Sequence, residues 1–224
     1  MYYRLPFGNV LALNKDTPFP SVDDALTEPN GLLAIGGDLS VNRLLSAYRQ
    51  GIFPWFSHQE PICWYSPNPR MVLFPDELKI SNSLNKTLKN TLFEVRFNTA
   101  FRELILNCAA VSREGQNGTW ITSEMIDAYC ELHRLGYAIS AETWHNNELI
   151  GGCYGIKINH MFFGESMFHF VRDASKIAFV NLVRKLNMDS VRLIDCQMKT
   201  AHLESLGARE ISRTEFAQSL LKLI

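Results

Sequence analysis

The sequence predicts an α+β fold, with a small N-terminal α+β domain over residues 1–62 and a larger domain over residues 63–224. Three observations support this prediction. The first sixty residues are rich in prolines and turns, three consecutive strand patterns follow in the middle of the chain, and helices then alternate with strands. Because strands joined by short turns pair antiparallel, we expect a mixed, mainly antiparallel sheet in the larger domain.

Caps and terminators predict the individual elements. Ser40 is expected to cap a helix that stops at Gly51, and His145 to Glu148 form a hairpin turn. The other expected elements are, in chain order, helices opened by Asn98 and Ser123, strands over 137–144, 149–157 and 161–168, a helix over 173–186, a strand over 190–197, a helix over 201–206, a strand over 208–211 and a helix opened by Ser212.

Composition restricts the function classes. Hydrophobic residues make up 46% and charged residues 20% of the chain, as in globular proteins. The formal net charge of -1 provides no global attraction to nucleic acid, so an RNA contact needs a local basic patch. The candidates for such a contact with a phosphate backbone are Lys79, Lys86 and Lys89, although a run of this kind is usually a solvated face.

Cysteine and histidine spacing and the lack of long apolar runs bear on metal binding and on the cellular location. The five cysteines contain no Cys-x-x-Cys pair and the six histidines no His-x-x-x-His spacing, so we expect free thiols and no metal site. No eighteen-residue apolar run occurs, and the first residues lack the charged-then-apolar pattern of a secretion signal. We therefore predict a cytoplasmic protein with no membrane partner.

Polar side chains at two strand ends are the candidates for chemistry. Strand alternation predicts that Asp195 and Gln197 project together while Ile194 and Cys196 face the other way. Glu165 ends another apolar strand, where an unpaired carboxylate is costly to bury. Taken alone, each acidic residue is more simply interpreted as structural, with Asp195 pairing inside the core and Glu165 exposed at a strand end.

Aromatic residues are the second group of interest. Five of them fall within Phe53 to Phe56 and Trp64 to Tyr65, in a proline-rich segment. Core packing is the default interpretation for these aromatic residues. Trp55 is the exception, because aromatic clusters beside loops can also stack on a flat base.

Several segments, in order along nearly the whole chain, resemble the leucyl/phenylalanyl-tRNA-protein transferase family. They are Gly31 to Leu39, Ala47 to Phe56, Gly118 to Thr122, Gly164 to Phe168, Ala174 to Lys176, Ile194 to Gln197 and Ser205 to Ala208. The resemblance implies a larger domain similar to the acetyltransferase fold of the GNAT superfamily. It also implies an enzyme that moves leucine or phenylalanine from aminoacyl-tRNA to proteins beginning with arginine or lysine, which marks them for N-end-rule degradation.

The resemblance also implies roles for single residues. Asp195, Gln197 and Glu165 are expected around the reacting centre, and Trp55 and Trp120 at the terminal adenosine of the tRNA. The expected walls of the pocket for the transferred side chain are Met167, Phe179, Leu182, Leu186 and Ile194. Motif identity supports Met167 and Ile194 best, whereas the positions on the helix could be ordinary core.

No cofactor is expected. Aminolysis of an ester is downhill, so it needs neither a nucleotide nor a metal. Coenzyme A, which GNAT enzymes bind through a glycine-rich loop, is disfavoured because the corresponding turn, Phe170 to Ala174, contains no glycine. The alternatives that stay open are a coenzyme A-dependent acyltransferase and a non-catalytic module that binds aminoacyl-tRNA.

Overall fold

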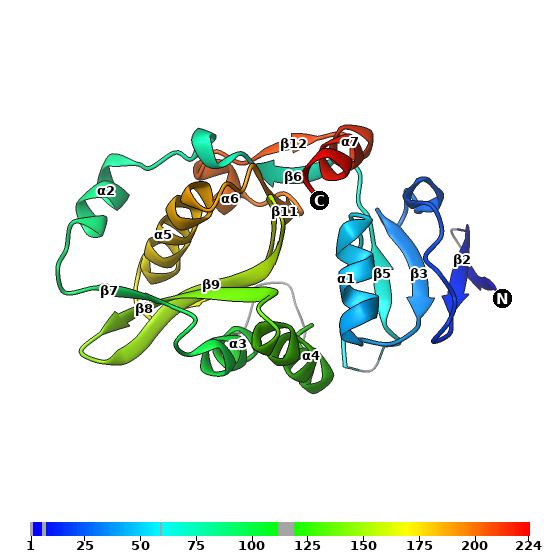
Figure 1. Cartoon of the computed structure of the whole chain (residues 1–224), viewed down its shortest axis with the longest axis horizontal. Coiled ribbons are helices and arrows are strands. Elements are labelled where there is room, and N and C mark those ends of the chain that lie inside the picture. Colours follow the sequence, from blue (N-terminus) through cyan, green and yellow to red (C-terminus); the bar gives the residue numbers. More distant parts are fainter. Residues whose placement is uncertain (1, 6–7, 59, 112–118) are drawn as a thin grey trace.

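Two β-sheets organise the chain in a computed structural model that describes residues 2–5, 8–58, 60–111 and 119–224 (Figure 1). Gly118, which begins one of the motifs quoted above, lies outside the described residues. The first sheet and one helix form the N-terminal part, and the second sheet with the remaining α-helices forms the rest (Figure 1). The predicted α+β architecture is therefore confirmed.

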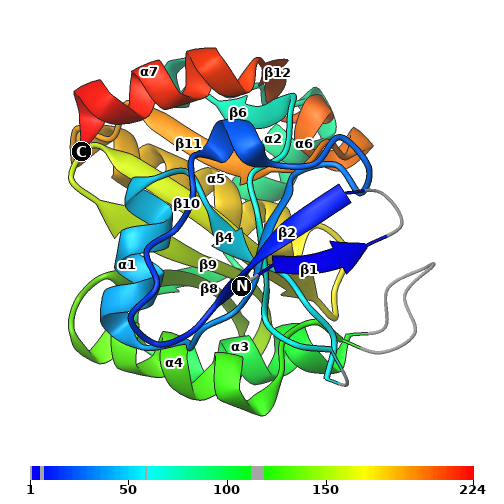
Figure 2. The ribbon, with the colours of Figure 1, turned by 90° about the vertical axis from the view of Figure 1, so that its right-hand side faces the viewer.

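The first sheet has five strands in the order β1-β2-β3-β5-β4. Their bounds are Tyr2–Leu5 (β1), Gly8–Leu13 (β2), Leu32–Gly36 (β3), Phe53–Pro54 (β4) and Cys63–Tyr65 (β5). Helix α1 (Val41–Arg49) follows β3 and begins as predicted, because the Ser40 side chain accepts a hydrogen bond from the Arg43 N–H. Figure 2 shows this part of the molecule in front of the second sheet.

The second sheet has seven strands in the order β12-β6-β11-β10-β9-β8-β7. Their bounds are Arg70–Leu73 (β6), Glu94–Phe97 (β7), Ala138–His145 (β8), Glu148–Ile158 (β9), Met161–His169 (β10), Leu193–Gln197 (β11) and Arg209–Ile211 (β12). Only β10 and β11 pair parallel, which confirms a mixed, mainly antiparallel sheet among the described residues. Asn146 and Asn147 both have positive φ in the predicted turn between β8 and β9.

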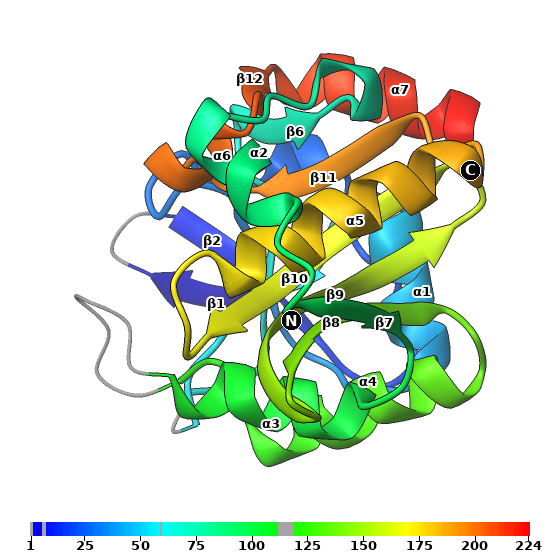
Figure 3. The same ribbon diagram turned by 90° about the vertical axis from the view of Figure 1, so that its left-hand side faces the viewer.

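Helices cover both faces of the second sheet. They are α2 (Asn82–Leu88), α3 (Phe101–Ala110), α4 (Ser123–Arg134), α5 (Ala174–Met188), α6 (Ala201–Ser205) and α7 (Arg213–Leu223), and two 3-10 turns cover Val22–Asp24 and Pro75–Glu77. Helix α5 packs on β8, β9 and β10 from one side, whereas α3 and α4 pack from the other (Figure 3). No helix in the described part of the chain is long and apolar enough to cross a membrane.

Some local predictions differ from the structure. Asn98 does not cap α3: Ala100 holds the N-cap position, and the Asn98 side chain accepts the Ser140 N–H instead. Thr122 rather than Ser123 caps α4. Strands β6 and β7 and helix α2 were not predicted, because each is short and gains its support from neighbouring elements rather than from its own pattern.

The domain boundary is less sharp than the predicted division at residues 62 and 63. Strand β5 pairs with β3 and β4, so the chain leaves the first sheet only after Tyr65 and joins the second at Arg70. One hydrophobic cluster also runs through both parts, from Tyr48 of α1 to Tyr129 of α4 and Phe163 of β10. The division into two domains stays a prediction, although the two sheets are distinct.

Candidate active site

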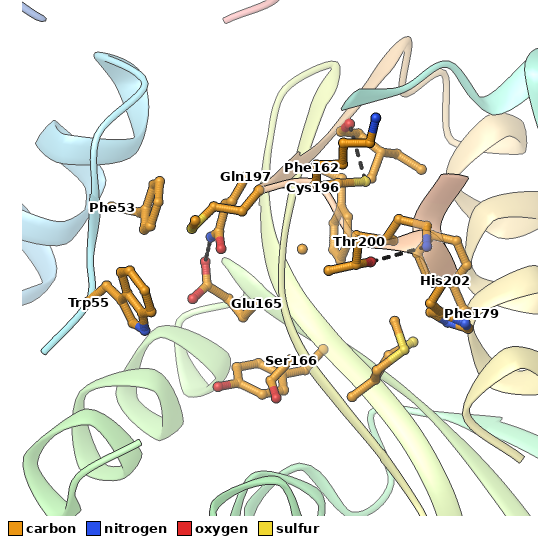
Figure 4. A pocket seen from close by; sticks show the side chains of 18 of the residues that line it. Phe53, Trp55, Phe162, Glu165, Ser166, Phe179, Cys196, Gln197, Thr200 and His202 are labelled. Carbon is orange, nitrogen blue, oxygen red and sulfur yellow. Dashed lines mark hydrogen bonds between the residues drawn. The ribbon is translucent and has the colours of Figure 1, made fainter. Parts of the chain in front are cut away.

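The parallel pair of strands separates at the centre of the second sheet. Strands β10 and β11 are in register from Met161 beside Leu193 to Phe163 beside Asp195, and their pairing ends there. Beyond that point a cavity of about 530 Å³ opens, lined by β9, β10, β11, α5, α6 and the segment Phe53–Trp55. Glu165 and Gln197 each lie two residues beyond the last pair, and they face each other in the cavity wall (Figure 4).

A β-bulge places Glu165 at the cavity. The register of β10 against β9 shifts between Gly164 and Ser166, so Glu165 is the extra residue. A side chain on Gly155 of β9 is impossible here, because a Cβ atom would lie 2.1 Å from the Phe163 carbonyl oxygen. Bulges commonly redirect a side chain beside an active site, and this one turns Glu165 toward the cavity.

Glu165 is held by three donors. Its Oε1 accepts hydrogen bonds from the Tyr48 hydroxyl at 2.7 Å and from Gln197 Nε2 at 3.2 Å, and its Oε2 accepts one from the Tyr129 hydroxyl at 3.0 Å. Burial raises the pKa of Glu165 to about 8, against the lowering effect of the two tyrosine hydroxyls. At neutral pH the carboxyl group is therefore mostly protonated.

Gln197 sits after a second bulge, in β11. The register against β6 shifts between Asp195 and Gln197, and Gln197 has a φ of 63°. The expected alternation is therefore broken: Ile194, Cys196 and Gln197 all line the cavity, whereas Asp195 does not. A non-glycine residue with positive φ needs support from its surroundings, and the Asp195 Oδ1 supplies it by accepting the Gln197 N–H at 2.9 Å.

Asp195 forms a buried ion pair with Arg70 of β6. Arg70 Nε lies 2.8 Å from Oδ1 and Nη2 lies 2.7 Å from Oδ2, and both side chains are 1% exposed. The Arg70 guanidinium lies between two rings, 4.8 Å from the centroid of Phe53 and 4.7 Å from that of Phe216. Both oxygens of Asp195 are thus bound by the buried Arg70, and Asp195 contacts the backbone N–H of Gln197 rather than its side chain.

The predicted pocket residues divide into two groups. Trp55, Trp120, Met167, Phe179, Leu182 and Ile194 line the cavity. Trp55 and Phe53 face Glu165 and Gln197 from the N-terminal side, with Phe179 on the opposite wall (Figure 4). Leu186 does not line the cavity, because it is completely buried in the core one turn beyond Leu182.

The three lysines lie away from this site. Lys86 belongs to α2, Lys89 caps its C-terminus, and Lys79 precedes it, and all three are exposed. Helix α2 packs against α5, at the opposite end of the molecule from the first sheet (Figure 1). None of them lines the cavity, so their contact with an RNA backbone stays a prediction.

Sequence reasoning missed the partners of the two carboxyl groups. Tyr48 and Tyr129 lie on the apolar faces of their helices and have the pattern of ordinary core residues. Arg70 carried a usable signal, because it directly precedes the apolar run Met71 to Phe74, where a buried cation requires a partner. No group of three or more potential metal ligands occurs among the described residues.

The fold and the cavity define a class of protein: an α+β protein whose cavity opens where two parallel strands of a mixed sheet separate. The family model described as leucyl/phenylalanyl-tRNA protein transferase matches residues 72–221, and the model of the N-terminal domain of that family matches residues 37–68. The chain therefore belongs to the leucyl/phenylalanyl-tRNA-protein transferase family.

Individual relatives agree with this assignment. A leucyl/phenylalanyl-tRNA-protein transferase from Nitrosomonas eutropha is 60% identical over 214 residues, which are 96% of this chain and 91% of the relative. One from Chromobacterium violaceum is 59% identical over 208 residues, or 93% of this chain and 89% of the relative. Among solved structures, a GCN5-related N-acetyltransferase from Kribbella flavida matches with a TM-score of 0.40 and 6% identity, covering 75% of this chain and 60% of that one. This last likeness is too distant to support a statement about activity.

Proposed function

We propose that this chain transfers leucine or phenylalanine from aminoacyl-tRNA to the amino terminus of proteins that begin with arginine or lysine. Such a transfer creates an N-end-rule degradation signal in the cytoplasm. The observation that carries the proposal is an apolar cavity that ends at the polar pair Glu165 and Gln197, in a chain of this family. The cavity has room for an aminoacyl group beside groups that can orient an amine.

The donor side of the proposal rests on the apolar walls. Met167, Phe179, Leu182 and Ile194 line the cavity, and burial of a leucine or phenylalanine side chain contributes about 1.5 to 3 kcal/mol. Shape is a weak filter for side chains of similar size, so we expect methionine to be transferred as well. Trp55 and Trp120 are our candidates for stacking on the terminal adenosine of the tRNA, a contact worth about 1 to 3 kcal/mol per base.

The reaction requires a neutral, correctly placed amine. The α-amino group has an unperturbed pKa of about 7.7 to 8.0, so only a modest shift is needed, and proximity to the ester supplies most of the acceleration. An amide is a poor base, so Gln197 is proposed to orient the amine by hydrogen bonding. Asp195 acts through Gln197 as a positioning residue, since it contacts the Gln197 backbone and does not line the cavity.

The acceptor preference rests on Glu165. Arg70 neutralises Asp195, which leaves Glu165 as the acidic residue that lines the cavity among the described residues. Once ionised, Glu165 would favour a cationic first residue. Lys79, Lys86 and Lys89 remain the proposed contacts with the tRNA backbone, at a distance from the reacting groups.

Transfer of labelled phenylalanine to three matched peptides tests the proposal. The peptides differ only in beginning with arginine, lysine or alanine, and the donor is phenylalanyl-tRNA. We expect label on the arginine and lysine peptides and little on the alanine peptide. Absence of transfer to any peptide, by folded protein that still binds the tRNA, would contradict the proposed reaction and favour a binding module.

A further inference from the structure

Two tyrosine side chains from distant parts of the sequence meet at Glu165 and form a closed ring with it. Tyr48 of α1 and Tyr129 of α4 each contact one carboxyl oxygen, at 2.7 Å and 3.0 Å. The two tyrosine hydroxyls also form a hydrogen bond with each other. The contacts therefore close a triangle of three hydrogen-bonded groups that lies directly behind the cavity wall.

The number of protons in this ring identifies its resting state. Three hydrogen bonds within a ring need three protons, and the two hydroxyls supply two. Burial, reinforced by Glu165, raises the pKa of both tyrosines well above 10, so these two protons stay in place at working pH. The third proton belongs to Glu165. In this protonated state one of the two hydroxyl-to-carboxyl hydrogen bonds is reversed: the carboxyl O–H donates to one hydroxyl, that hydroxyl donates to the other, and the second hydroxyl donates to the remaining carboxyl oxygen.

The ionised form of Glu165 is also satisfied. When the proton leaves, both hydroxyls and Gln197 Nε2 donate to the carboxylate, and the hydrogen bond between the two hydroxyls is given up because both hydroxyl protons now point to Glu165. The other charged groups that act on Glu165 are Asp195 of β11, which raises its pKa, and Arg70 of β6, which lowers it. Because Asp195 and Arg70 form an ion pair with each other, their effects on the pKa of Glu165 oppose each other. Glu165 therefore has a stable hydrogen-bond pattern in both protonation states, as a group that exchanges protons requires.

We propose that Glu165 accepts the proton of the acceptor's terminal amine, and that Tyr48 and Tyr129 are the positioning residues that match its proton affinity to that amine. The inference rests on the proposed function and assigns a base to it. Glu165 is the carboxyl group in the described cavity wall that is hydrogen-bonded to Gln197, whereas Gln197 itself is an amide and the two oxygens of Asp195 are occupied by Arg70. The imidazole of His202 also lines the cavity, but it lies beside Phe179, across the cavity from Glu165 and Gln197 (Figure 4).

The match of proton affinities explains why the carboxyl group is buried. An ordinary glutamate has a pKa of about 4.3 and the amine one of about 7.7 to 8.0, so proton transfer to it would be unfavourable by more than a factor of about 1,000. Burial raises the pKa of Glu165 to about 8, which removes this difference. The two hydroxyls oppose burial and prevent a larger rise, which would leave the carboxyl group protonated throughout the working pH range.

The proton balance closes over one cycle. Glu165 first loses its resting proton to water. The carboxylate then takes one proton from the acceptor's ammonium group: an N–H bond breaks, its electron pair stays on nitrogen, and an O–H bond forms on Glu165. The neutral amine attacks the ester carbonyl, the ester C–O bond breaks as the amide forms, and the second nitrogen proton ends on the ribose oxygen that leaves. No oxidant, metal or nucleotide takes part.

Two measurements on Tyr48→Phe and Tyr129→Phe test the inference, since each substitution removes a hydroxyl and keeps the ring that fills the space. The first is an infrared titration of the protonated carboxyl band in the protein alone, assigned by its loss in Glu165→Gln. We expect a midpoint near 8 in the unmodified protein. Loss of one donor to the charged form should raise this midpoint by about one pH unit in either variant.

The second measurement is the pH profile of kcat for transfer to a peptide that begins with arginine. The amine of the peptide titrates identically with every variant, so a displaced profile reports on the protein. We expect both variants to need a pH about one unit higher for half-maximal kcat. Tyr137→Phe is the matched control, because Tyr137 lies outside the cavity and outside the ring.

The outcomes separate the two proposals. Transfer by the unmodified protein together with unshifted profiles in both variants would overturn the role of the ring alone. An infrared midpoint below about 6 in the unmodified protein would overturn the protonated resting state. If the unmodified protein transferred nothing while its infrared titration behaved as expected, the proposed function would fall and the assignment of the base would fall with it.

Discussion

Two carboxyl groups lie on the neighbouring strands β10 and β11, Glu165 two residues beyond the pair that contains Asp195, and their environments are opposite. Asp195 belongs to the last parallel pair of β10 and β11, is completely buried, and is bound through both oxygens by Arg70. Glu165 lies two residues beyond that pair, faces the cavity, and is held by hydroxyl and amide groups without a direct cation. The partners of each carboxyl group, rather than the group itself, therefore decide whether it serves as a fixed support or as a titrating group.

Among the substitutions that bear on this contrast, removal of Arg70 should have the largest effect on stability. Arg70→Met leaves Asp195 buried without its partner, and we expect a loss of about 3 to 5 kcal/mol in the free energy of unfolding, measured with urea. Addition of Asp195→Asn in the same chain should recover part of the loss, because the unpaired charge is then gone. The matched control is Arg209→Met, which breaks the exposed pair with Glu77 and should cost less than about 1 kcal/mol.

Equal losses in Arg70→Met and Arg209→Met would contradict the view that Asp195 is a support held by charge pairing. The view would also be contradicted if the double variant Arg70→Met, Asp195→Asn were less stable than Arg70→Met alone. Asp195 would then be stabilising the protein through other contacts.

The dependence of stability on pH should identify Glu165 as the titrating partner. Because its pKa is raised from 4.5 to about 8 on folding, the folded protein binds more protons than the unfolded chain between these values. The contribution of Glu165 is therefore complete below about pH 4.5 and is lost as the pH rises to about 8, with a slope of at most about 1.4 kcal/mol per unit. Urea unfolding at a series of pH values should show this decline, and Glu165→Gln should remove it.

An unchanged slope in Glu165→Gln would show that other groups cause the decline. Asp195→Asn is not an equivalent control for this experiment, because it leaves the Arg70 charge buried and unpaired.

The smallest expected effect concerns the rings around Arg70. Phe216→Leu removes one of the two aromatic faces that contact the guanidinium, and we expect it to cost about 1 to 2 kcal/mol of stability while Asp195 stays paired. The control is Phe170→Leu, since Phe170 is 61% exposed and its replacement should change stability by less than about 0.5 kcal/mol. Similar losses in the two variants would show that the aromatic contact adds nothing to the ion pair.

Much of the local structure follows from the sequence alone. Ser40 and Ser212 begin helices where their hydroxyls accept the third following N–H, and Asn146 and Asn147 close a hairpin at positive φ. Met167, Phe179, Leu182 and Ile194, which the family resemblance placed in the pocket, line the cavity. Caps, turns and periodicity are local properties, so local sequence is sufficient for them.

The arrangement of the site depends on tertiary contacts that local sequence does not specify. The two bulges that turn Glu165 and Gln197 into the cavity depend on how β10 and β11 pair with their neighbours. Strand alternation therefore correctly placed Asp195 opposite Ile194 and Cys196, but it was wrong for Gln197, which faces the cavity with Cys196. Leu186 had the same helical spacing as Leu182 but lies beyond the end of the cavity. The partners of the two carboxyl groups come from α1, α4 and β6, and no local pattern relates residues so far apart in the chain.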